Sequence, residues 1–306
     1  STEGSGAMIS AVLNFLKPPG MTSHDAVSFV RHTYRQKRVG HSGTLDPAAA
    51  GVLPIYLGNA TRLVEYGDSF AKTYRAEVLL GIKTDTGDDT GTVLQQTTVS
   101  LPPLHRIREV IESFQGGYEQ VPPMYSAIKI DGKKLYELAR AGKIVQRQAR
   151  RIEIPSISLL AVHDCRLTIE VSCSKGTYIR TLCEDIGERL AMPATMSLLL
   201  RTRVGPFAVN RSVSMEEIAA EPEQTLLPPE FAVSHLPACT LSEAESTDLR
   251  HGRLVCSGCL LKAGDDAQIV RLYDAKRTFF GMGRFDSADG MLKPIKIFSG
   301  GMDELC

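Results

Sequence analysis

The chain has 306 residues, with 35 Lys and Arg side chains against 35 Asp and Glu, so its formal net charge is zero. Hydrophobic residues make up 43% and charged residues 23%, a balance typical of a folded protein with a sizeable core, which excludes global disorder. The length predicts one large domain or two unequal ones, and the zero net charge argues against a uniformly basic nucleic-acid binder.

The N-terminal part predicts a strand followed by a helix. Residues 9–16 form an apolar run that ends at a Pro-Pro-Gly sequence, which indicates a buried strand. Ser23 is the predicted N-cap of a helix whose apolar residues recur at helical spacing. The seven residues before Met8 (STEGSGA) resemble a cloning remnant, and we exclude them from the prediction of the fold.

Strands and helices are interleaved along the middle of the chain. Residues 74–80 and 167–173 alternate between apolar and polar side chains, which is the period of a half-buried strand. Apolar residues from Ile107 to Phe114 and from Ile179 to Leu190 follow helical spacing. Since strands outnumber helices, we expect an α+β fold with a mixed, mainly antiparallel central sheet flanked by helices and loops.

The C-terminal part predicts a smaller unit. Residues 216–230 form an acidic, Pro-containing stretch that indicates a helix and a linker. Beyond it, short strand patterns separated by turns are typical of a small β-domain. We therefore place a larger domain in residues 8–235 and a second domain in residues 236–306.

Positive charge is concentrated in residues 120–151, the basic insertion. It holds eight Lys and Arg side chains, among them Lys133, Lys134 and Arg140, against only two acidic residues. A solvated basic helix face is the ordinary explanation for such a run. The zero net charge of the chain therefore conceals a local basic surface, and it does not exclude a nucleic-acid partner.

The segment Gly40–Pro54 (GHSGTLDPAAAGVLP) is the most unusual in the chain. Its glycines allow backbone conformations closed to other residues, and Pro47 restricts Asp46 to an extended geometry. We expect a rigid loop that presents His41 and Asp46 near one another, as a nucleophilic or basic carboxylate requires. The alternative is structural, with Asp46 capping a helix that begins at Pro47.

A second motif, KGTYIR at residues 175–180, lies where a predicted strand passes into a helix. Arg180 adjoins the apolar face of that helix, so a partly buried guanidinium would need a carboxylate partner, for which Asp46 is a candidate. Such a pair would keep the Asp ionised, as a nucleophile requires. An ion pair with another acid is the structural alternative, and Tyr74 by itself is a core aromatic.

Several motifs together resemble the bacterial TruB family of tRNA pseudouridine-55 synthases. They are GHSGTLDPAAAGVLP, the run from Lys72-Thr73-Tyr74 into Leu80-Gly81, VPPMYSAIKIDGKKLYELARAGK, and SKGTYIR followed by Leu199-Leu200-Arg201-Thr202. The resemblance runs in order from about Asn14 to Phe207, and it departs from the family pattern beside Asp46 without removing a reactive group. It implies a pseudouridine-synthase fold, with a PUA-like RNA-binding domain in residues 236–306.

The resemblance also implies an isomerase that converts a flipped-out uridine in the T-loop of tRNA to pseudouridine. Asp46 would be the nucleophile, which attacks C1′ or C6 or removes a proton from C2′. Arg180 would pair with it, and Tyr74 would stack on the base and take part in proton transfer from C5. The substrate-binding residues implied are His41, Tyr178, Leu199, Lys133, Lys134 and Arg140. Two tyrosines and a Pro-Pro turn make the basic insertion a candidate for closing on RNA.

Isomerisation leaves composition and oxidation state unchanged, so we expect no cofactor and no metal. The chain has no P-loop or dinucleotide fingerprint, and Cys256 and Cys259 form a lone C-x-x-C pair without the second pair that zinc needs. The acidic octet at residues 84–91 is expected to be a turn between strands rather than a calcium loop.

The expected partner is tRNA, and we expect a monomer without membrane attachment, because no apolar run reaches the roughly 18 residues of a membrane span. Seven scattered cysteines favour a reducing, cytoplasmic location. The alternative function is a tRNA-binding RNA chaperone with little or no catalysis. Asp46 beside Arg180 argues against it, since a pure binder has no use for that pair.

Overall fold

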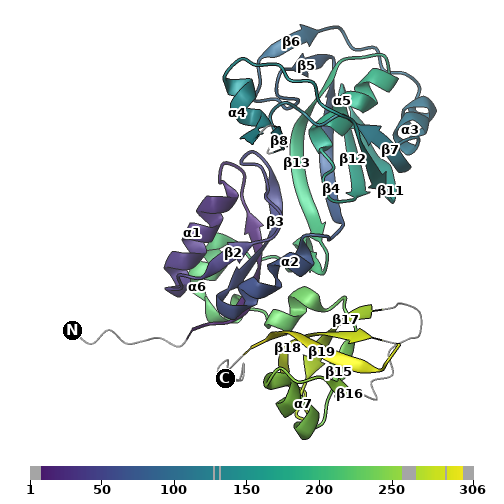
Figure 1. The fold of residues 1–306 in the computed structure, drawn as a ribbon. Coiled ribbons are helices and arrows are strands. Elements are labelled where there is room, and N and C mark those ends of the chain that lie inside the picture. Colours follow the sequence, from purple (N-terminus) through teal and green to yellow (C-terminus); the bar gives the residue numbers. More distant parts are fainter. Residues whose placement is uncertain (1–7, 127, 131, 257–266, 287, 299–306) are drawn as a thin grey trace.

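The structure is a computed structural model that describes residues 8–126, 128–130, 132–256, 267–286 and 288–298. The predicted cloning remnant at residues 1–7 lies outside these ranges. Two sheets, one of eight strands and one of five, organise the described part of the chain (Figure 1).

The larger sheet has the strand order β1-β3-β13-β4-β12-β11, with β2 paired to β3 and β14 to β13. Its strands are β1 (Ala11–Lys17), β2 (Val39–His41), β3 (Ala50–Leu57), β4 (Lys72–Leu80), β11 (Ser156–His163), β12 (Arg166–Cys173), β13 (Ala194–Val204) and β14 (Phe207–Ala208). Strand β13 is parallel to β3, and the other pairs in this sheet are antiparallel. The predicted mixed, mainly antiparallel sheet is therefore confirmed.

Helices α3 and α5 cover one part of this sheet, and α1 covers another (Figure 1). The α-helices are α1 (Ser23–Tyr34), α2 (Val64–Gly67), α3 (Leu104–Glu112), α4 (Leu135–Arg140), α5 (Ile179–Arg189), α6 (Met215–Ala220) and α7 (Glu243–Arg250). Short 3-10 turns are η1 (Gly58–Leu63), η2 (Val209–Arg211), η3 (Glu223–Thr225) and η4 (Pro229–Val233). The predicted helices at 107–114 and 179–190 correspond to α3 and α5.

Three two-stranded ribbons flank the larger sheet. They pair β7 (Gly116–Gln120) with β10 (Arg150–Ile154), β5 (Ile82–Thr84) with β6 (Val93–Gln96), and β8 (Lys129–Ile130) with β9 (Lys133–Lys134). The acidic octet at 84–91 connects β5 to β6, and the Asp88 carboxylate accepts hydrogen bonds from the Thr86 and Thr90 hydroxyls. It is thus a turn between strands, as predicted.

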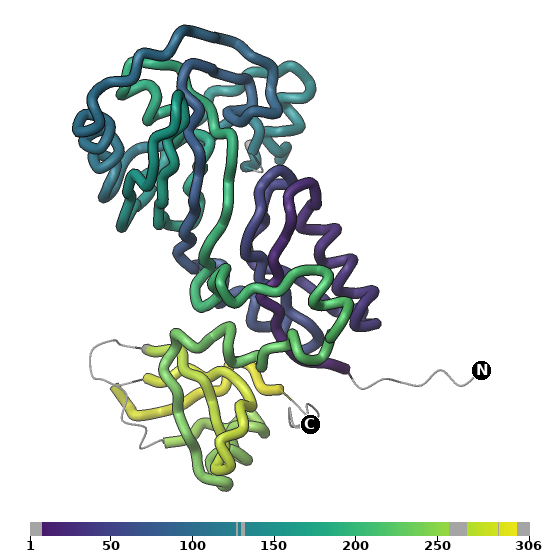
Figure 2. The backbone as a smooth tube through the Cα atoms, turned by 180° about the vertical axis from the view of Figure 1, so that it is seen from behind, coloured from purple at the N-terminus to yellow at the C-terminus, as the bar shows by residue number. Residues whose placement is uncertain are grey.

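The second sheet has the order β15-β17-β18-β19-β16. Its strands are β15 (Ala238–Thr240), β16 (Val255–Cys256), β17 (Ala267–Tyr273), β18 (Phe279–Asp286) and β19 (Met291–Ile297). Phe279, Met282 and Phe298 share one buried cluster with Val52 and Tyr56 of β3, so apolar side chains join the two sheets. Figure 2 shows the backbone of the second sheet beside the N-terminal part of the larger one.

Near α1 and β3, one prediction is wrong and one structural alternative is excluded. The N-cap of α1 is Thr22, which forms a reciprocal capping box with Asp25, while the predicted cap, Ser23, is turned toward another segment. No helix begins at Pro47, because that residue enters a turn closed by a hydrogen bond from Ala49 N to Asp46 O at 3.0 Å. Asp46 is therefore not a helix cap.

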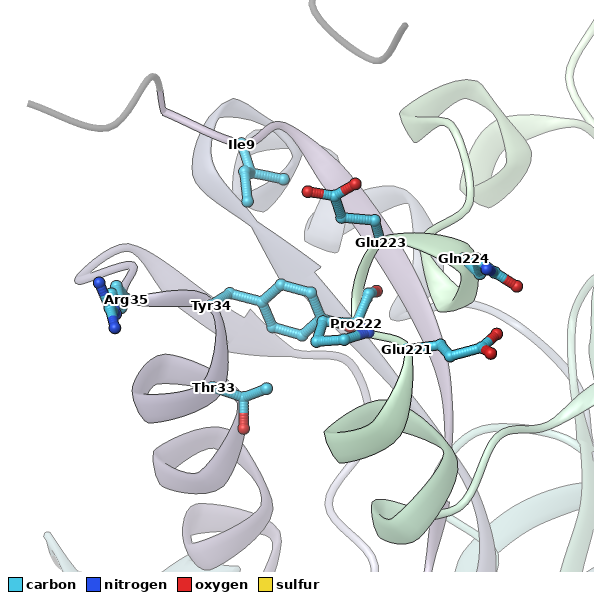
Figure 3. A pocket seen from close by; sticks show the side chains of 8 residues that line it. All are labelled: Ile9, Thr33, Tyr34, Arg35, Glu221, Pro222, Glu223 and Gln224. Atoms are coloured by element: carbon cyan, nitrogen blue, oxygen red, sulfur yellow. The ribbon is translucent and has the colours of Figure 1, made fainter.

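The C-terminal end of α1 borders a cavity of about 410 Å³ (Figure 3). The Tyr34 side chain points from α1 toward Pro222, and its hydroxyl donates to the Pro222 carbonyl at 2.8 Å. Glu221 and Glu223 stand at the rim of this cavity. The contact ties α1 to the segment after α6.

Asp185 places a half-buried titratable carboxyl on α5. Burial raises its pKa to about 6, helped by Glu188 and opposed by a hydrogen bond from the Tyr118 hydroxyl at 3.3 Å. Because the pKa is higher in the folded state, the protonated carboxyl stabilises the fold below about pH 4, and this contribution is lost as the pH rises through about 6.

We expect Asp185→Asn to raise the unfolding midpoint at pH 7, on the order of a few degrees, since the amide oxygen keeps the acceptor without a buried charge. At about pH 4 the variant and the wild type should unfold together. Thermal unfolding followed by circular dichroism across this range tests it. A variant that is less stable than wild type at pH 7 would contradict the assignment.

Candidate active site

A small cavity lies where the loop after β2, strands β4 and β13 and the start of α5 converge. Its volume is about 130 Å³, and we call it the Asp46 cavity. The lining residues are Thr44, Leu45, Asp46, Tyr74, Thr177, Tyr178, Ile179, Arg180 and Leu199. Five of the predicted site residues, which are far apart in the sequence, therefore meet around one space.

The Asp46 loop, residues 42–49, is held through its backbone by Ser23 of α1 and by Gly20, which precedes that helix. The Ser23 hydroxyl donates to the Leu45 carbonyl at 3.0 Å and accepts from the Leu45 amide at 2.9 Å. The Gly20 amide donates to the Pro47 carbonyl at 2.7 Å. Leu45 and Pro47, the two neighbours of Asp46 in the sequence, are thus anchored through their backbone groups. These bonds fix the position of Asp46 and leave the oxygens of its carboxylate unused.

Two fully buried cations complete this support. Arg201 donates to the carbonyls of Gly43, at 2.9 Å, and Thr44, at 3.3 Å, and to Val52 O at 2.9 Å. Lys17 donates to the carbonyls of Pro47, Pro18 and Met21, at 3.2, 2.8 and 2.6 Å. Three carbonyl acceptors use all three Lys17 protons, while burial lowers its pKa to about 8.

The approach of β3 to β13 explains a glycine in the motif. Gly51 has φ +122°, and a Cβ atom there would lie 2.2 Å from the carbonyl oxygen of Arg201. Only glycine therefore allows β3 to pair with β13 at this point, where Gly51 is the register partner of Arg201. The same contact brings the Arg201 guanidinium under the Asp46 loop.

Arg180 reaches the cavity from the first turn of α5, and its side chain is 11% exposed. It donates to the carbonyls of Thr86, at 3.1 Å, and Tyr125, at 2.8 Å, and its Nη2 lies 3.8 Å from Asp46 Oδ2. The Asp46 side chain is 54% exposed. An ion pair with one side chain this exposed contributes about 0–1 kcal/mol to folding. The hydrogen bonds around the two residues therefore hold them in place, and the pair remains available to a ligand.

Tyr74 stands on β4, opposite Arg201 of β13, and is 9% exposed. Burial raises its pKa to about 12, against the opposing effect of the Arg201 guanidinium. The phenol is therefore neutral near pH 7. It offers the cavity an aromatic face and a hydroxyl rather than a phenolate.

The remaining predicted site residues divide into two groups. Tyr178, at the N-cap of α5, and Leu199, on β13, line the Asp46 cavity. His41 does not line it: it ends β2, opposite Ile55, and is half-buried. Burial lowers the His41 pKa, with Arg201 adding to the effect. The imidazole is thus neutral near pH 7.

The basic insertion carries Lys133, Lys134 and Arg140 outside the cavity. Lys133 and Arg140 are exposed, and Lys134 is half-buried. The Lys134 ammonium and the Arg140 guanidinium each lie 5.4 Å from the centre of the Tyr136 ring, within the range of a cation–π contact. The insertion therefore presents an aromatic side chain flanked by two positive charges.

The sequence interpretation did not assign a role to Lys17, Ser23 or Arg201 in the site. Lys17 ends an apolar strand, and Arg201 follows three leucines. A charged residue within an apolar pattern is a signal of a buried, hydrogen-bonded cation. That signal marks both residues, but it does not name the carbonyl groups that they bind.

Two further expectations concern metals and membranes. Within the described ranges, no group of three or more His, Cys, Asp and Glu side chains is placed to hold a metal ion. No helix in those ranges combines the length and apolarity needed to cross a bilayer. Of the C-x-x-C pair, Cys256 is a free thiol and Cys259 lies outside the described residues.

Comparison with protein families matches most of the chain. Residues 31–179 match the TruB family pseudouridylate synthase N-terminal domain. Residues 180–234 match the tRNA pseudouridylate synthase B C-terminal domain, and residues 237–298 match the pseudouridine synthase II TruB C-terminal domain. The three matches follow one another along the chain, from residue 31 to residue 298.

Individual relatives agree with these matches. The tRNA pseudouridine synthase B of Alkaliphilus oremlandii is 44% identical over 293 residues, which cover 94% of this chain and 97% of the relative. That of Bacillus licheniformis is 41% identical over 302 residues, covering 95% and 98%.

A solved structure shares the fold. It is an H/ACA RNP bound to a substrate RNA containing 2′-deoxyuridine, with a TM-score of 0.73 and 23% identity, and the match covers 95% of this chain and 85% of that one. The expected fold class is thereby confirmed. With these relatives matched along nearly its whole length, the chain belongs to the TruB family of pseudouridine synthases.

Proposed function

We propose that this chain is a tRNA pseudouridine synthase that isomerises a flipped-out uridine of the T-loop, with Asp46 as the reacting carboxylate. The observation that carries the proposal is the convergence of Asp46, Arg180 and Tyr74 on one small cavity. The relatives named tRNA pseudouridine synthase B support the substrate.

The reaction sets simple requirements for the site. The C1′–N1 bond of the nucleotide breaks, the uracil turns, and a C1′–C5 bond forms, while a proton leaves C5 and N1 gains one. Atoms and oxidation state are conserved, so the reaction consumes no co-reactant. The site must supply a carboxylate fixed beside the ribose or base, and walls that hold the uracil while it is detached.

The size of the Asp46 cavity matches a base rather than a whole nucleotide. Its volume of about 130 Å³ is well below the roughly 300–1,000 Å³ of pockets for drug-sized ligands. A uracil would enter, while its ribose and phosphates stay at the mouth beside the exposed Asp46 carboxylate. Entry from a folded RNA requires the base to leave its stack.

The predicted site residues that line the cavity then have distinct roles. Arg180 orients the Asp46 carboxylate, because two carbonyl acceptors already fix its guanidinium. Neutral Tyr74 stacks on the uracil, and Tyr178 and Leu199 complete the walls. His41 ends β2, directly before the Asp46 loop, and does not line the cavity. Because the Tyr74 phenol is neutral, a group other than a Tyr74 phenolate must accept the proton that leaves C5.

The rest of the molecule would grip the tRNA. We assign residues 8–235 to the catalytic domain, its basic insertion to closing on the RNA, and residues 236–306 to a PUA-like RNA-binding domain. Phosphate contacts by Lys133, Lys134 and Arg140 would position the T-loop without reading its sequence. The enzyme would act as a monomer in the cytoplasm, where tRNA is found.

A tRNA chaperone without catalysis is the weaker alternative. RNA binding alone gives no reason for a loop whose two residues beside Asp46 are both anchored by their backbone. It also gives no reason for an arginine held 3.8 Å from that carboxylate.

We expect Asp46→Asn to lower pseudouridine formation at least about a thousand-fold, because the amide is neither a nucleophile nor a base. The assay is chemical labelling of pseudouridine in T-loop RNA. Asp164→Asn, which alters an exposed carboxylate in the β11–β12 turn, serves as the control and should be fully active. Equal product from Asp46→Asn and wild type would refute the role of Asp46.

A second expectation concerns the basic insertion. Neutralising Lys133, Lys134 and Arg140 together should weaken tRNA binding and reduce the slope of log Kd against log salt by about two to three, since fewer counterions are released. Binding titrations over a salt series measure the slope. Neutralising Arg106 and Arg108 on α3, on the other side of the molecule from α4 in Figure 1, is the control. An unchanged slope for the triple variant would place the RNA elsewhere.

A further inference from the structure

A buried amide connects the start of the basic insertion to the Asp46 cavity. Gln120 ends β7 and is 2% exposed. Its Nε2 donates to the Tyr178 carbonyl at 3.0 Å, and its Oε1 accepts from the Tyr178 amide at 2.8 Å. The side chain thus pairs with both backbone groups of one residue, as a neighbouring strand would.

The second amide proton of Gln120 extends this pairing to Tyr118 and Asp185. Nε2 also donates to the Tyr118 hydroxyl at 2.7 Å, and that hydroxyl donates to Asp185 Oδ2 at 3.3 Å. Asp185 lies on α5, the helix that Tyr178 caps. A Gln120 amide turned by 180° would set Oε1 against the Tyr178 carbonyl and Nε2 against the Tyr178 amide, so the two bonds to Tyr178 allow one orientation only.

The backbone that Gln120 holds is the one that builds the cavity wall. Tyr178 lines the cavity, and α5 begins directly after it with no side-chain cap of its own. Arg180 follows two residues later and donates to Tyr125 O, which belongs to the basic insertion. The first turn of α5 is therefore attached to the insertion at two points, Gln120 and Tyr125.

We propose that Gln120 is a positioning residue for pseudouridine formation: its amide fixes the backbone of Tyr178 and so sets where Tyr178 and Arg180 stand relative to Asp46. This inference rests on the proposed function. Gln120 touches neither the cavity nor Asp46, so it acts through the residues that it holds. Its effect should appear in the rate of the chemical step and leave the affinity for tRNA nearly unchanged.

The first test separates rate from binding. Gln120→Ala should lower the single-turnover rate constant on T-loop RNA by about 10- to 100-fold, since displacement of a reacting group by about 1 Å has effects of this size. The Kd for tRNA should change less than about twofold. Tyr118→Phe is the matched control: it removes the accessory hydroxyl but keeps both bonds to Tyr178, and should cost less than about fivefold.

The second test uses a carboxyl in place of the amide. In Gln120→Glu, the ionised side chain has no proton to donate to the Tyr178 carbonyl and repels it. The protonated side chain again offers one donor and one acceptor to Tyr178. The ratio of its rate constant to that of wild type should therefore rise as the pH falls from about 8 to about 6. The titratable or charged residues bonded to or paired with this network are Tyr118, Tyr178, Asp185 on α5, and Arg150, the register partner of Gln120 on β10.

The outcomes are distinct. A Gln120→Ala rate constant within twofold of wild type, or a loss confined to tRNA affinity, would overturn the positioning role. If Gln120→Ala does not fold, the Gln120→Glu ratio decides: a rise at low pH supports the role, and a flat ratio overturns it. A wild-type enzyme that forms no pseudouridine would overturn the proposed function itself, and the Gln120 role with it.

Discussion

The site depends on buried donors that hold backbone carbonyls of the Asp46 loop. Lys17 and Arg201 are fully buried, and burial of a charge is costly unless hydrogen bonds compensate it. Here carbonyl oxygens of the loop, at Gly43, Thr44 and Pro47, accept half of these hydrogen bonds, and carbonyls of Val52, Pro18 and Met21 accept the rest. The loop and the two cations therefore require each other. Because these bonds use backbone carbonyls, the Asp46 carboxylate takes no part in holding the loop.

The topology of the larger sheet brings the other partners to this loop. Strand β13 pairs with β3 on one side and β4 on the other, so Arg201 reaches under the loop while Tyr74 stands beside it. Helix α5 follows β12 directly and directs Arg180 toward Asp46. The basic insertion then touches this centre through Tyr125 and Gln120. A segment proposed to meet RNA is thus joined by hydrogen bonds to the residues proposed to meet the uracil.

Much of the fold follows from local patterns. Alternation at 74–80 and 167–173 and helical spacing from Ile179 predicted strands and a helix that the structure contains, because half-burial imposes those periods. The N-cap of α1 was misplaced by one residue. Thr22 and Ser23 are both good caps, but only Thr22 has an acidic residue, Asp25, three positions later to complete a capping box, while Ser23 bonds to Leu45. The roles of Lys17, Arg201 and Gln120 depend on carbonyl and amide groups of distant segments. Such partners have no side-chain signature, so the sequence pattern did not reveal them.

The most direct measurement is a structure of the enzyme with a T-loop RNA that carries 5-fluorouridine at the target position. The account predicts the fluorinated uracil inside the Asp46 cavity, with the Asp46 carboxylate and Arg180 at its edge and the Tyr74 ring against its face. It also predicts RNA phosphates beside the basic insertion. A target base that stays stacked in the RNA, or that occupies a different cavity such as the one beside Tyr34, would contradict it.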